Sequence, residues 1–523
     1  MISSSRAPQT APRALQAADG VPLELTSIVR ALEAQFAVTT GPKQTVRRRR
    51  LDTFDRRLRA AGLTLEHRLT AGRGATARDS GERLLLGRPD GSSPVAVPVK
   101  NLRWPALADA LPPGPVRDAV APVTGVRALM VASDERRCLR RLELRNHDGK
   151  TVARVDLDEP ASVSAMAETA QLTVRRLRGY DEQARRADRL LVGLGLRAVE
   201  LEGDGEEGTS GSAQTPSADR EVPARVLLTS ALSGFFAAMR ENLPGLLEDV
   251  DTEFLHDFRV AVRRTRATLK LGRPVLPEVM RSRWEPAFRS LGDLTTPLRD
   301  LDVYELDLPS MTHWLVTANP SDLDPLAAHL RTRRTVARRA LVRSLRSAAS
   351  RRQVTEWGEE LALLAVMPQD ADGEPLSAGE LADRSISRVY RRVARDGAVI
   401  GADSPATDLH ELRKRCKELR YALEVFAPLI DHAAGKRAVS DLKGLQDVLG
   451  LFQDSEVRRR AMRGFAEEMM AEGTTAGAML AMGELIGHLD VEQERARREF
   501  DAAFARFERP SSLRLIHRLG GER

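Results

Sequence analysis

Residues 256–270 read HDFRVAVRRTRATLK, and residues 410–424 read HELRKRCKELRYALE. The first stretch falls on the second when the sequence is shifted by 154 residues, and no gap is needed from residue 256 to residue 303. The shift places His256 on His410, Arg259 on Arg413, Arg263 on Lys417, Arg266 on Arg420, Leu269 on Leu423, Arg283 on Arg437, Arg289 on Lys443 and Asp300 on Asp454. This period is too long for a solenoid, so the sequence predicts two copies of a helical bundle that face each other.

Each stretch carries a basic stripe beside an apolar one. At about 100° per residue, Arg259, Arg263 and Arg266 fall within one arc of about 80°, and Lys270 continues it. The opposite face is apolar and carries Phe258, Val262 and Leu269. The second stretch repeats the basic stripe with His410, Arg413, Lys417 and Arg420.

The repeated stripe predicts an anion-binding site. Like charges three or four residues apart repel on a helix by about 0.2–0.5 kcal/mol per pair, and a bound anion would relieve that repulsion. A single basic run is more often only a solvated face, but here the same register occurs twice. The predicted binding residues are His256, Arg259, Arg263, Arg266, Lys270, Arg283, Arg289, His410, Arg413, Lys414, Lys417, Arg420, Tyr421, Arg437 and Lys443.

The two histidines have two interpretations. Either they are packed or capped helix residues, or they donate to phosphate more strongly when protonated. Asp300 and Asp454 are expected to orient arginines or cap helices. This half contains no nucleophile–base pair and no Gly-rich phosphate loop, so we expect no catalytic residues, no metal and no cofactor.

Composition restricts the class of protein. The 523 residues contain 81 Lys and Arg against 74 Asp and Glu, which gives a net charge of +7. The two cysteines, Cys138 and Cys416, fit neither a disulfide framework nor a metal site. We expect a cytoplasmic protein, because the sequence shows no signal peptide and no apolar run of membrane-spanning length.

The predicted organisation has five parts. Residues 1–21 are expected to be a disordered tail, 22–200 an antiparallel α+β domain, 201–221 a flexible linker, 222–508 an all-α domain and 509–523 a C-terminal tail. In the α+β part, Asp148-Gly149 between two alternating runs predicts a hairpin. In the helical part, helices are predicted over 224–241, 253–272, 281–294, 324–349, 353–364, 378–396, 407–427, 433–449, 453–471 and 474–507.

The helical half resembles the CHAD family, the conserved-histidine α-helical domain. The resemblance rests on His256-x-x-Arg259-x-x-x-Arg263, on its partner at His410, on Leu298-Arg299-Asp300-Leu301-Asp302, and on 442–450, LKGLQDVLG. It implies two pseudo-symmetric four-helix bundles with a basic channel between them that binds inorganic polyphosphate. It also implies association with polyphosphate granules and no enzymatic activity. The second copy differs from the first at Glu418 and Glu424, which align with Arg264 and Lys270, so the charge is not the same in the two copies.

The N-terminal half resembles a CYTH domain, a triphosphate-tunnel β-barrel. The resemblance rests on 51–63, LDTFDRRLRAAGL, and on 142–159 with its hairpin. At the family's metal-binding and triphosphate-binding positions, this sequence departs from the family pattern. The family's opening Glu-x-Glu-x-Lys strand has no match before residue 50. Gly87 stands where the family has a lysine in the tunnel, and Gln171-x-Thr173 stands where it has a late Glu-x-Glu strand. A site without its carboxylates cannot hold Mg²⁺, so we expect a degenerate domain without hydrolytic activity.

The sequence therefore predicts a non-enzymatic polyphosphate-binding protein with no membrane partner. One alternative is a metal-dependent triphosphatase that acts through the N-terminal domain. Another is a nucleic-acid-binding protein, which the scarcity of aromatic residues for base stacking makes less favoured. The sequence leaves the oligomeric state open.

Overall fold

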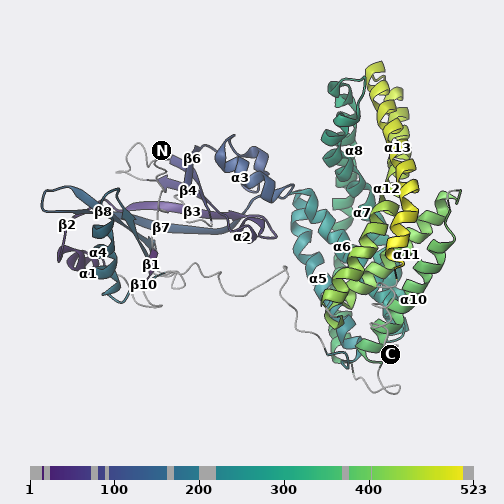
Figure 1. The fold of residues 1–523 in the computed structure, drawn as a ribbon, viewed down its shortest axis with the longest axis horizontal. Helices are drawn as coiled ribbons and strands as arrows, with labels where there is room; N and C mark the ends of the chain where they lie inside the picture. The colour runs from purple at the N-terminus through teal and green to yellow at the C-terminus, as the bar shows by residue number, and fades with distance from the viewer. Residues whose placement is uncertain are drawn as a thin grey trace, which may run out of the picture. The chain divides into compact units, whose positions relative to one another are not determined.

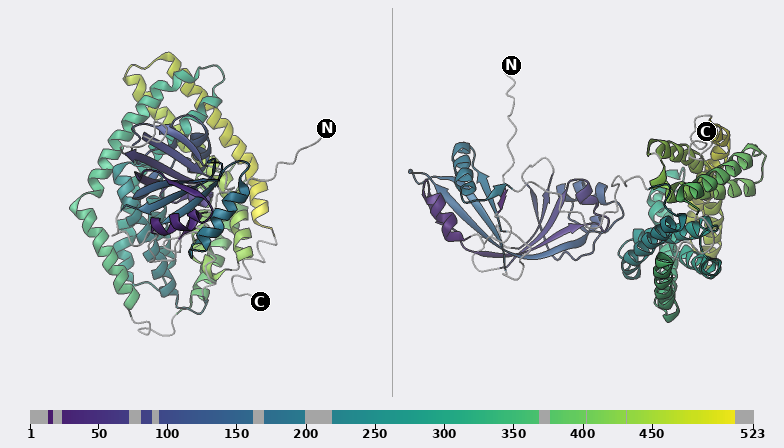
Figure 2. Two further views of the ribbon diagram at one scale, coloured as in Figure 1. Left: turned by 90° about the vertical axis from the view of Figure 1, so that its left-hand side faces the viewer. Right: turned by 90° about the horizontal axis from the view of Figure 1, so that it is seen from below.

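The computed structural model describes residues 14–16, 24–71, 81–88, 94–161, 170–198, 219–367, 376–401, 403–430 and 432–509. The chain divides into two compact units, Met1–Gly211 and Ser212–Arg523. The first is built around a β-sheet and the second from helices alone (Figures 1 and 2). The boundary falls inside the linker predicted over 201–221, and each unit is described by itself below.

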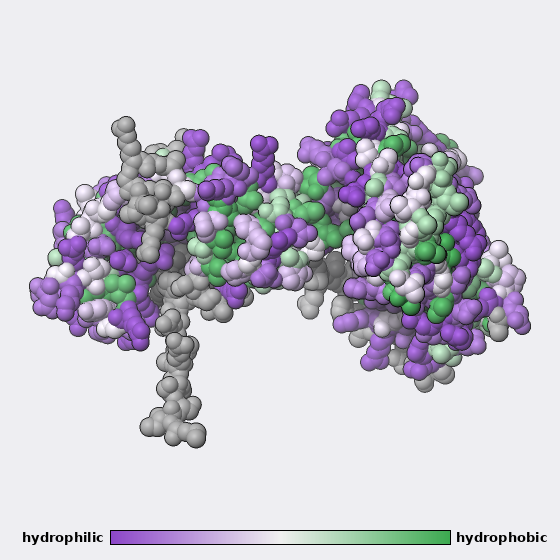
Figure 3. Space-filling view, turned by 90° about the horizontal axis from the view of Figure 1, so that it is seen from above, coloured by the Kyte–Doolittle hydropathy of each residue, from purple (hydrophilic) through white to green (hydrophobic). Residues whose placement is uncertain are grey.

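Hydrophilic side chains cover most of the face shown in Figure 3, with smaller hydrophobic patches between them. Among the described helices, none is both long enough and apolar enough to cross a membrane.

The first unit contains one antiparallel sheet. Its strands are β1 (Ala14–Gln16), β2 (Ala37–Thr40), β3 (Gln44–Asp52), β4 (Thr64–Ala71), β5 (Gly81–Gly87), β6 (Val95–Val99), β7 (Met130–Arg145), β8 (Thr151–Pro160), β9 (Gln171–Arg176) and β10 (Arg197–Ala198). They pair in the order β10-β1-β9-β8-β7-β3-β4-β5-β6, and β2 pairs with β7. The predicted hairpin joins β7 to β8, with Gly149 at a φ of 73° in its turn.

The N-terminal resemblance implied a barrel-like domain, but the described strands do not close into a barrel. No pairing among them joins β6 to β10, so the sheet has two edges. In the right-hand view of Figure 2 it bends into an open trough. The antiparallel α+β class is confirmed, whereas barrel closure is not.

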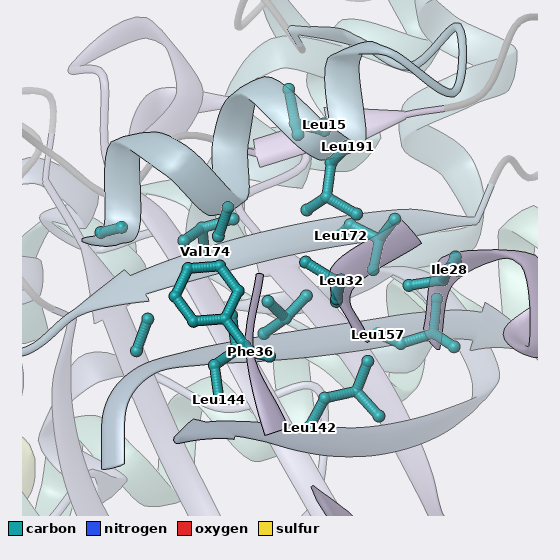
Figure 4. Packing of buried hydrophobic residues seen from close by; sticks show 14 of the residues in the cluster. Leu15, Ile28, Leu32, Phe36, Leu142, Leu144, Leu157, Leu172, Val174 and Leu191 are labelled. Carbon is teal, nitrogen blue, oxygen red and sulfur yellow. The ribbon is translucent and has the colours of Figure 1, made fainter. Parts of the chain in front are cut away.

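Two hydrophobic clusters hold this unit together. In the first, α1 (Leu25–Glu33) and α4 (Asp181–Val192) pack on β7, β8 and β9, where Leu32, Leu142 and Leu157 are all buried (Figure 4). Amphipathic helices with one apolar face are suited to cover such a sheet. In the second, α3 (Pro115–Thr124) packs on the β4–β6 end, and the short α2 (Arg57–Ala60) places Leu58 in the same cluster.

Two predicted boundaries were wrong. Strand β1 lies inside the predicted tail at 1–21, and its Leu15 is fully buried against β9 and β10. At the other boundary, the last residues of the predicted linker belong to the helical unit, since Arg220 pairs with Asp383 at 2.6 Å. The rest of the linker and most of both predicted tails lie outside the described residues.

The second unit contains α5 (Ala224–Glu248), α6 (Thr252–Leu271), α7 (Glu278–Met311), α8 (Asp324–Leu345), α9 (Ala348–Val366), α10 (Ala378–Ala398), α11 (Ala406–Val425), α12 (His432–Ala471) and α13 (Ala476–Phe507). The starts of α5, α6 and α7, at residues 224, 252 and 278, recur 154 residues later in α10, α11 and α12. The residues just before α5 and α10, Pro223 and Ser377, form a bridge with each other. The repeat found in the sequence is therefore a repeat of helices.

Helix α12 is a single helix where the sequence predicted two, and α7 runs to Met311 although it contains Pro286, Pro297 and Pro309. Tertiary packing explains why these helices continue. Leu449 of α12, just before the predicted break, and Phe452, inside it, are both buried. Leu298 and Leu301 of α7 are buried beyond Pro297. Packing of an apolar face commonly overrides the local cost of Gly or Pro.

Candidate anion-binding surface

Helices α6 and α11 lie against each other and are joined by two reciprocal ion pairs. Arg264 of α6 pairs with Glu424 of α11 at 3.1 Å, and Lys270 of α6 pairs with Glu418 of α11. Arg264 and Glu418 occupy the same repeat position, as do Lys270 and Glu424. Such reciprocal pairing is the contact pattern of a local two-fold axis.

Between these ion pairs, the basic stripes of the two helices come together. Lys417 of α11 lies in the electrostatic field of Arg413 and Arg420 on its own helix and of Arg263 on α6. Arg263 is the repeat equivalent of Lys417, so equivalent cations meet across the pair of helices. Burial and these three positive charges lower the pKa of Lys417 to about 8, although Asp454 opposes the shift. The surface thus concentrates positive charge, and nearby carboxylates compensate part of it.

Arg259 is held by α7 through neutral acceptors. One of its terminal nitrogens donates to the carbonyl of Gly292 at 3.0 Å and to the hydroxyls of Thr295 at 2.7 Å and Thr296 at 3.0 Å. Its Nε is buried and has no acceptor among the described residues. Burial, followed by the neighbouring Arg263, lowers the pKa of Arg259. Neutral partners thus accept its hydrogen bonds, while Asp300 and Asp293 act on it through their electrostatic field.

Arg266 reaches the same segment of α7. A Cβ atom added at Gly292 would lie only 3.3 Å from an Arg266 terminal nitrogen, so the absence of a side chain lets the guanidinium approach the helix. Arg259 and Arg266 therefore both lie against residues 292–296, two turns apart along α6.

The second copy differs because carboxylates hold its arginines. Arg413 pairs with Asp454 at 3.0 Å, and Arg420 donates to Glu424 at 2.7 Å. Lys414 pairs with Glu411 on its own helix at 2.7 Å. The predicted role of Asp454 in orienting an arginine is confirmed. The first copy is thus the less compensated half of the surface.

The two histidines occupy equivalent positions with different neighbours. His410 Nδ1 lies 2.8 Å from Gln453 Oε1. His256 lies near Arg299, the repeat equivalent of Gln453. Burial, followed by the Arg299 charge, lowers the pKa of His256, and Glu253 and Asp257 oppose the shift.

The remaining predicted residues are not all brought to this surface. Arg283 pairs with Glu356 on α9 at 2.7 Å, and Lys270 is engaged in its ion pair with Glu418. Tyr421 lies near Arg420. Arg289, Arg437 and Lys443 are exposed and form no ion pair with described residues.

Sequence reasoning missed the α7 residues that hold the arginines. Thr295 and Thr296 align with Leu449 and Gly450, so these threonines do not recur in the second copy as the basic residues do. An adjacent pair of threonines within a predicted helix is a weak signal, because their hydroxyls commonly bond the preceding turn. Both do so here as well.

In the first unit, arginines pair with the carboxylates on one face of the sheet. Arg48 contacts Glu135 at 2.7 Å and Asp158 at 3.1 Å, and Arg137 contacts Asp158 at 2.6 Å. Glu66 pairs with Arg68 at 2.6 Å. Among the described residues no group of His, Cys, Asp and Glu side chains has the arrangement of a metal site.

The helical unit matches a known protein family. Residues 230–463 match the family model described as CHAD domain. No curated protein matches the chain. Of the solved structures, the CHAD domain of the plant Ricinus communis is 24% identical, with a TM-score of 0.45, and covers 61% of this chain and 98% of its own.

Two further structures were compared. PptA from Streptomyces chartreusis is 18% identical, with a TM-score of 0.43, and covers 54% of this chain and 99% of its own. The PH1819 protein from Pyrococcus horikoshii is 11% identical, with a TM-score of 0.22, and covers 37% of this chain and 92% of its own. The family assignment follows from the family model, whose matched residues include both basic stripes: the helical unit of this chain carries a CHAD domain.

Proposed function

We propose that the helical unit binds inorganic polyphosphate along α6 and α11, in a basic channel between two pseudo-symmetric four-helix bundles. The observation that carries the proposal is the pair of duplicated basic stripes on two helices that pack against each other through reciprocal ion pairs. Arg259, Arg266, Arg413 and Arg420 extend the positive surface along the same two helices. A linear polyanion can contact all of these cations at once, whereas a single phosphate can contact only a few of them.

The residue types favour phosphate chains over nucleic acid. Arginine presents a planar fork of donors that matches phosphate oxygens. Stacking of bases uses exposed aromatic side chains, and the bidentate contact to adenine uses Asn or Gln, neither of which occurs on α6 or α11. Of the aromatic residues on α6 and α11, Phe254 and Phe258 are buried, and only Tyr421 lies near the stripe.

Titration of the full-length chain tests this function. Long-chain polyphosphate should bind tightly. Its affinity should fall steeply as the salt concentration rises, because Lys and Arg side chains that contact phosphates release the counterions of the polyphosphate. Orthophosphate should bind far more weakly, and single-stranded DNA should compete poorly. Equal affinity for orthophosphate and long chains, or salt-independent binding, would contradict the proposal.

Lys417 predicts a pH signature of binding. Its pKa of about 8 leaves it partly uncharged in the empty protein at pH 8. A bound polyanion would stabilise the ammonium form and raise this pKa, so the protein should take up protons on binding. We expect calorimetry at pH 8 in buffers of different ionisation enthalpy to show net proton uptake, which Lys417→Arg should diminish. Binding without proton exchange at pH 8 would show that Lys417 lies outside the site.

The first unit is proposed to be a CYTH-like domain without hydrolytic activity. Its support is that Glu66, Glu135 and Asp158 are already engaged by arginines, which leaves them poorly placed to hold a divalent cation. We expect no release of phosphate from tripolyphosphate in the presence of Mg²⁺ or Mn²⁺. Metal-dependent release that is lost in Glu135→Gln would instead support the triphosphatase alternative.

Polyphosphate binding would place the protein at cytoplasmic polyphosphate granules. A fluorescent fusion should colocalise with stained granules, and the fusion should disperse in cells that are unable to make polyphosphate.

A further inference from the structure

A second row of arginines lies on α10 and is separate from the surface formed by α6 and α11. The row, called the α10 stripe below, consists of Arg384, Arg388, Arg391 and Arg395, all of them exposed. At about 100° per residue, the four fall within an arc of about 60° and extend over about 16 Å of helix. Neighbouring members are three or four residues apart, so their charges repel one another.

Carboxylates compensate only the two ends of the α10 stripe. Glu380 lies 4.0 Å from Arg384, and Asp396 lies 2.7 Å from Arg395. The side chains of these two arginines are still 70% and 74% exposed. The two arginines in the middle of the stripe form no ion pair with described residues. The stripe is therefore a row of positive charge that is open to an external anion.

The helical bundle does not need these charges. Helix α5 is the repeat equivalent of α10, and its residues at the four equivalent positions are Ser230, Gly234, Ala237 and Glu241. None of them is a cation, so a helix without these arginines fills the equivalent place in the first copy. The repulsion along α10 thus has no counterpart in the first copy, and a bound polyanion would relieve it.

The α10 stripe and the basic stripe of α11 face different directions. Arg415 joins α11 to Asp396 of α10 at 3.7 Å, and it lies about 160° around α11 from Lys417. Helix α10 therefore flanks the side of α11 that is away from its basic stripe, and Figure 1 shows α10 at the edge of the helical unit. On α10, Tyr390 packs against Phe507 of α13 and lies about 130° from the centre of the α10 stripe. The two basic surfaces can thus contact separate polyphosphate segments.

The side chains of the α10 stripe indicate the class of its ligand. A protein partner would bury an apolar core at the interface, whereas Ser387 and Arg392 flank this row. Arginines in a straight row match the oxygens of a linear phosphate chain, and base stacking would need aromatic side chains that the row lacks. We propose that the α10 stripe is a second polyphosphate-binding surface, by which one molecule joins two polyphosphate chains.

This inference rests on the polyphosphate binding proposed above for α6 and α11. The α10 stripe is the weaker of the two surfaces, because contacts of fully solvated arginines contribute less than those of partly buried ones. Its contribution is therefore expected in the joining of chains more than in the affinity for a single chain.

Fluorescence cross-correlation tests this joining in the full-length chain, with two polyphosphate populations that carry end labels of different colours. The unaltered protein at micromolar concentration should make the two colours diffuse together. Glutamine at the four positions of the α10 stripe should reduce the cross-correlation at least fivefold, because each molecule then holds one chain. Each labelled chain alone should still bind this variant through α6 and α11, with an affinity within about threefold of the unaltered protein.

A control with the same change in charge locates the effect. Glutamine at Arg331, Arg339, Arg343 and Arg346, which lie at or next to α8 and spread over about 120° around its axis, should leave the cross-correlation intact. Cross-correlation that the α10 variant retains, or its absence in unaltered protein that binds each colour, would overturn the second surface and leave the proposed function standing. Failure of the unaltered protein to bind either colour would contradict the proposed function itself. Stripe-dependent joining of polyphosphate to single-stranded DNA, as strong as to a second polyphosphate chain, would overturn the assignment of the stripe to polyphosphate.

Discussion

Replacing four cations of the α6–α11 surface by glutamine should weaken binding of long-chain polyphosphate about 10³-fold at low salt. The four changes are Arg263→Gln, Arg266→Gln, Lys417→Gln and Arg420→Gln. The magnitude assumes about 1 kcal/mol for each lost contact between a cation and phosphate. These residues are chosen over Arg259 because Arg259 also donates three hydrogen bonds that hold it on α7. The measurement is a binding isotherm with each protein at one salt concentration.

A matched control separates the site from net charge. Glutamine at Arg331, Arg339, Arg343 and Arg346, all exposed and at or next to α8, removes the same four charges elsewhere in the unit. This control should lose little affinity, and its salt dependence should remain close to that of the unaltered protein. The site variant should lose about 0.7 in the slope of log K against log salt for each cation removed. Equal losses in both variants would mean that binding follows net charge and not this surface.

The largest effect on stability is expected from Arg334→Ala. Arg334 of α8 pairs with Asp249 and Asp302, each at 2.7 Å, and the Asp302 side chain is 1% exposed. Removing the guanidinium leaves a buried carboxylate without its partner, which should lower the free energy of unfolding by about 3–5 kcal/mol at pH 8. Chemical denaturation measures the loss, and Arg339→Ala on the same helix should change stability by less than about 0.5 kcal/mol.

The same variant should show a pH dependence of defined sign. Burial raises the pKa of Asp302 to about 6 even with Arg334 present. Its folded pKa is thus above its unfolded value, so ionisation of Asp302 lowers stability as pH rises through this range. Loss of Arg334 should raise the pKa further. The loss of unfolding free energy caused by Arg334→Ala should therefore become smaller from pH 8 to pH 5, because at pH 5 Asp302 is protonated in both folded proteins. A penalty that is independent of pH would exclude this cause.

The duplicated stripe could be predicted from the sequence because its basic residues recur at the same positions 154 residues apart. Arg259 and Arg413 recur at one register, and the helices that carry them begin and end at equivalent residues. The partners of these arginines could not be predicted, since Thr296 and Gly450 differ between the copies and reach α6 and α11 only through tertiary packing.

The missed boundaries have a similar origin. Strand β1 has three residues and no periodicity of its own, and it forms because β9 and β10 supply its hydrogen bonds and bury Leu15. Gly450 indicated a helix end, yet α12 continues through it because Leu449 and Phe452 are both buried.

The central claim, that polyphosphate lies along the basic stripes of α6 and α11, is tested most directly by the reactivity of Lys417. With a pKa of about 8, its amine should react readily with acetic anhydride at pH 8, and Lys150 of the first unit serves as the reference lysine. Mass spectrometry of both lysines, with and without saturating long-chain polyphosphate, gives the result. The account predicts strong protection of Lys417 and unchanged labelling of Lys150. Saturated binding with Lys417 still fully reactive would contradict it.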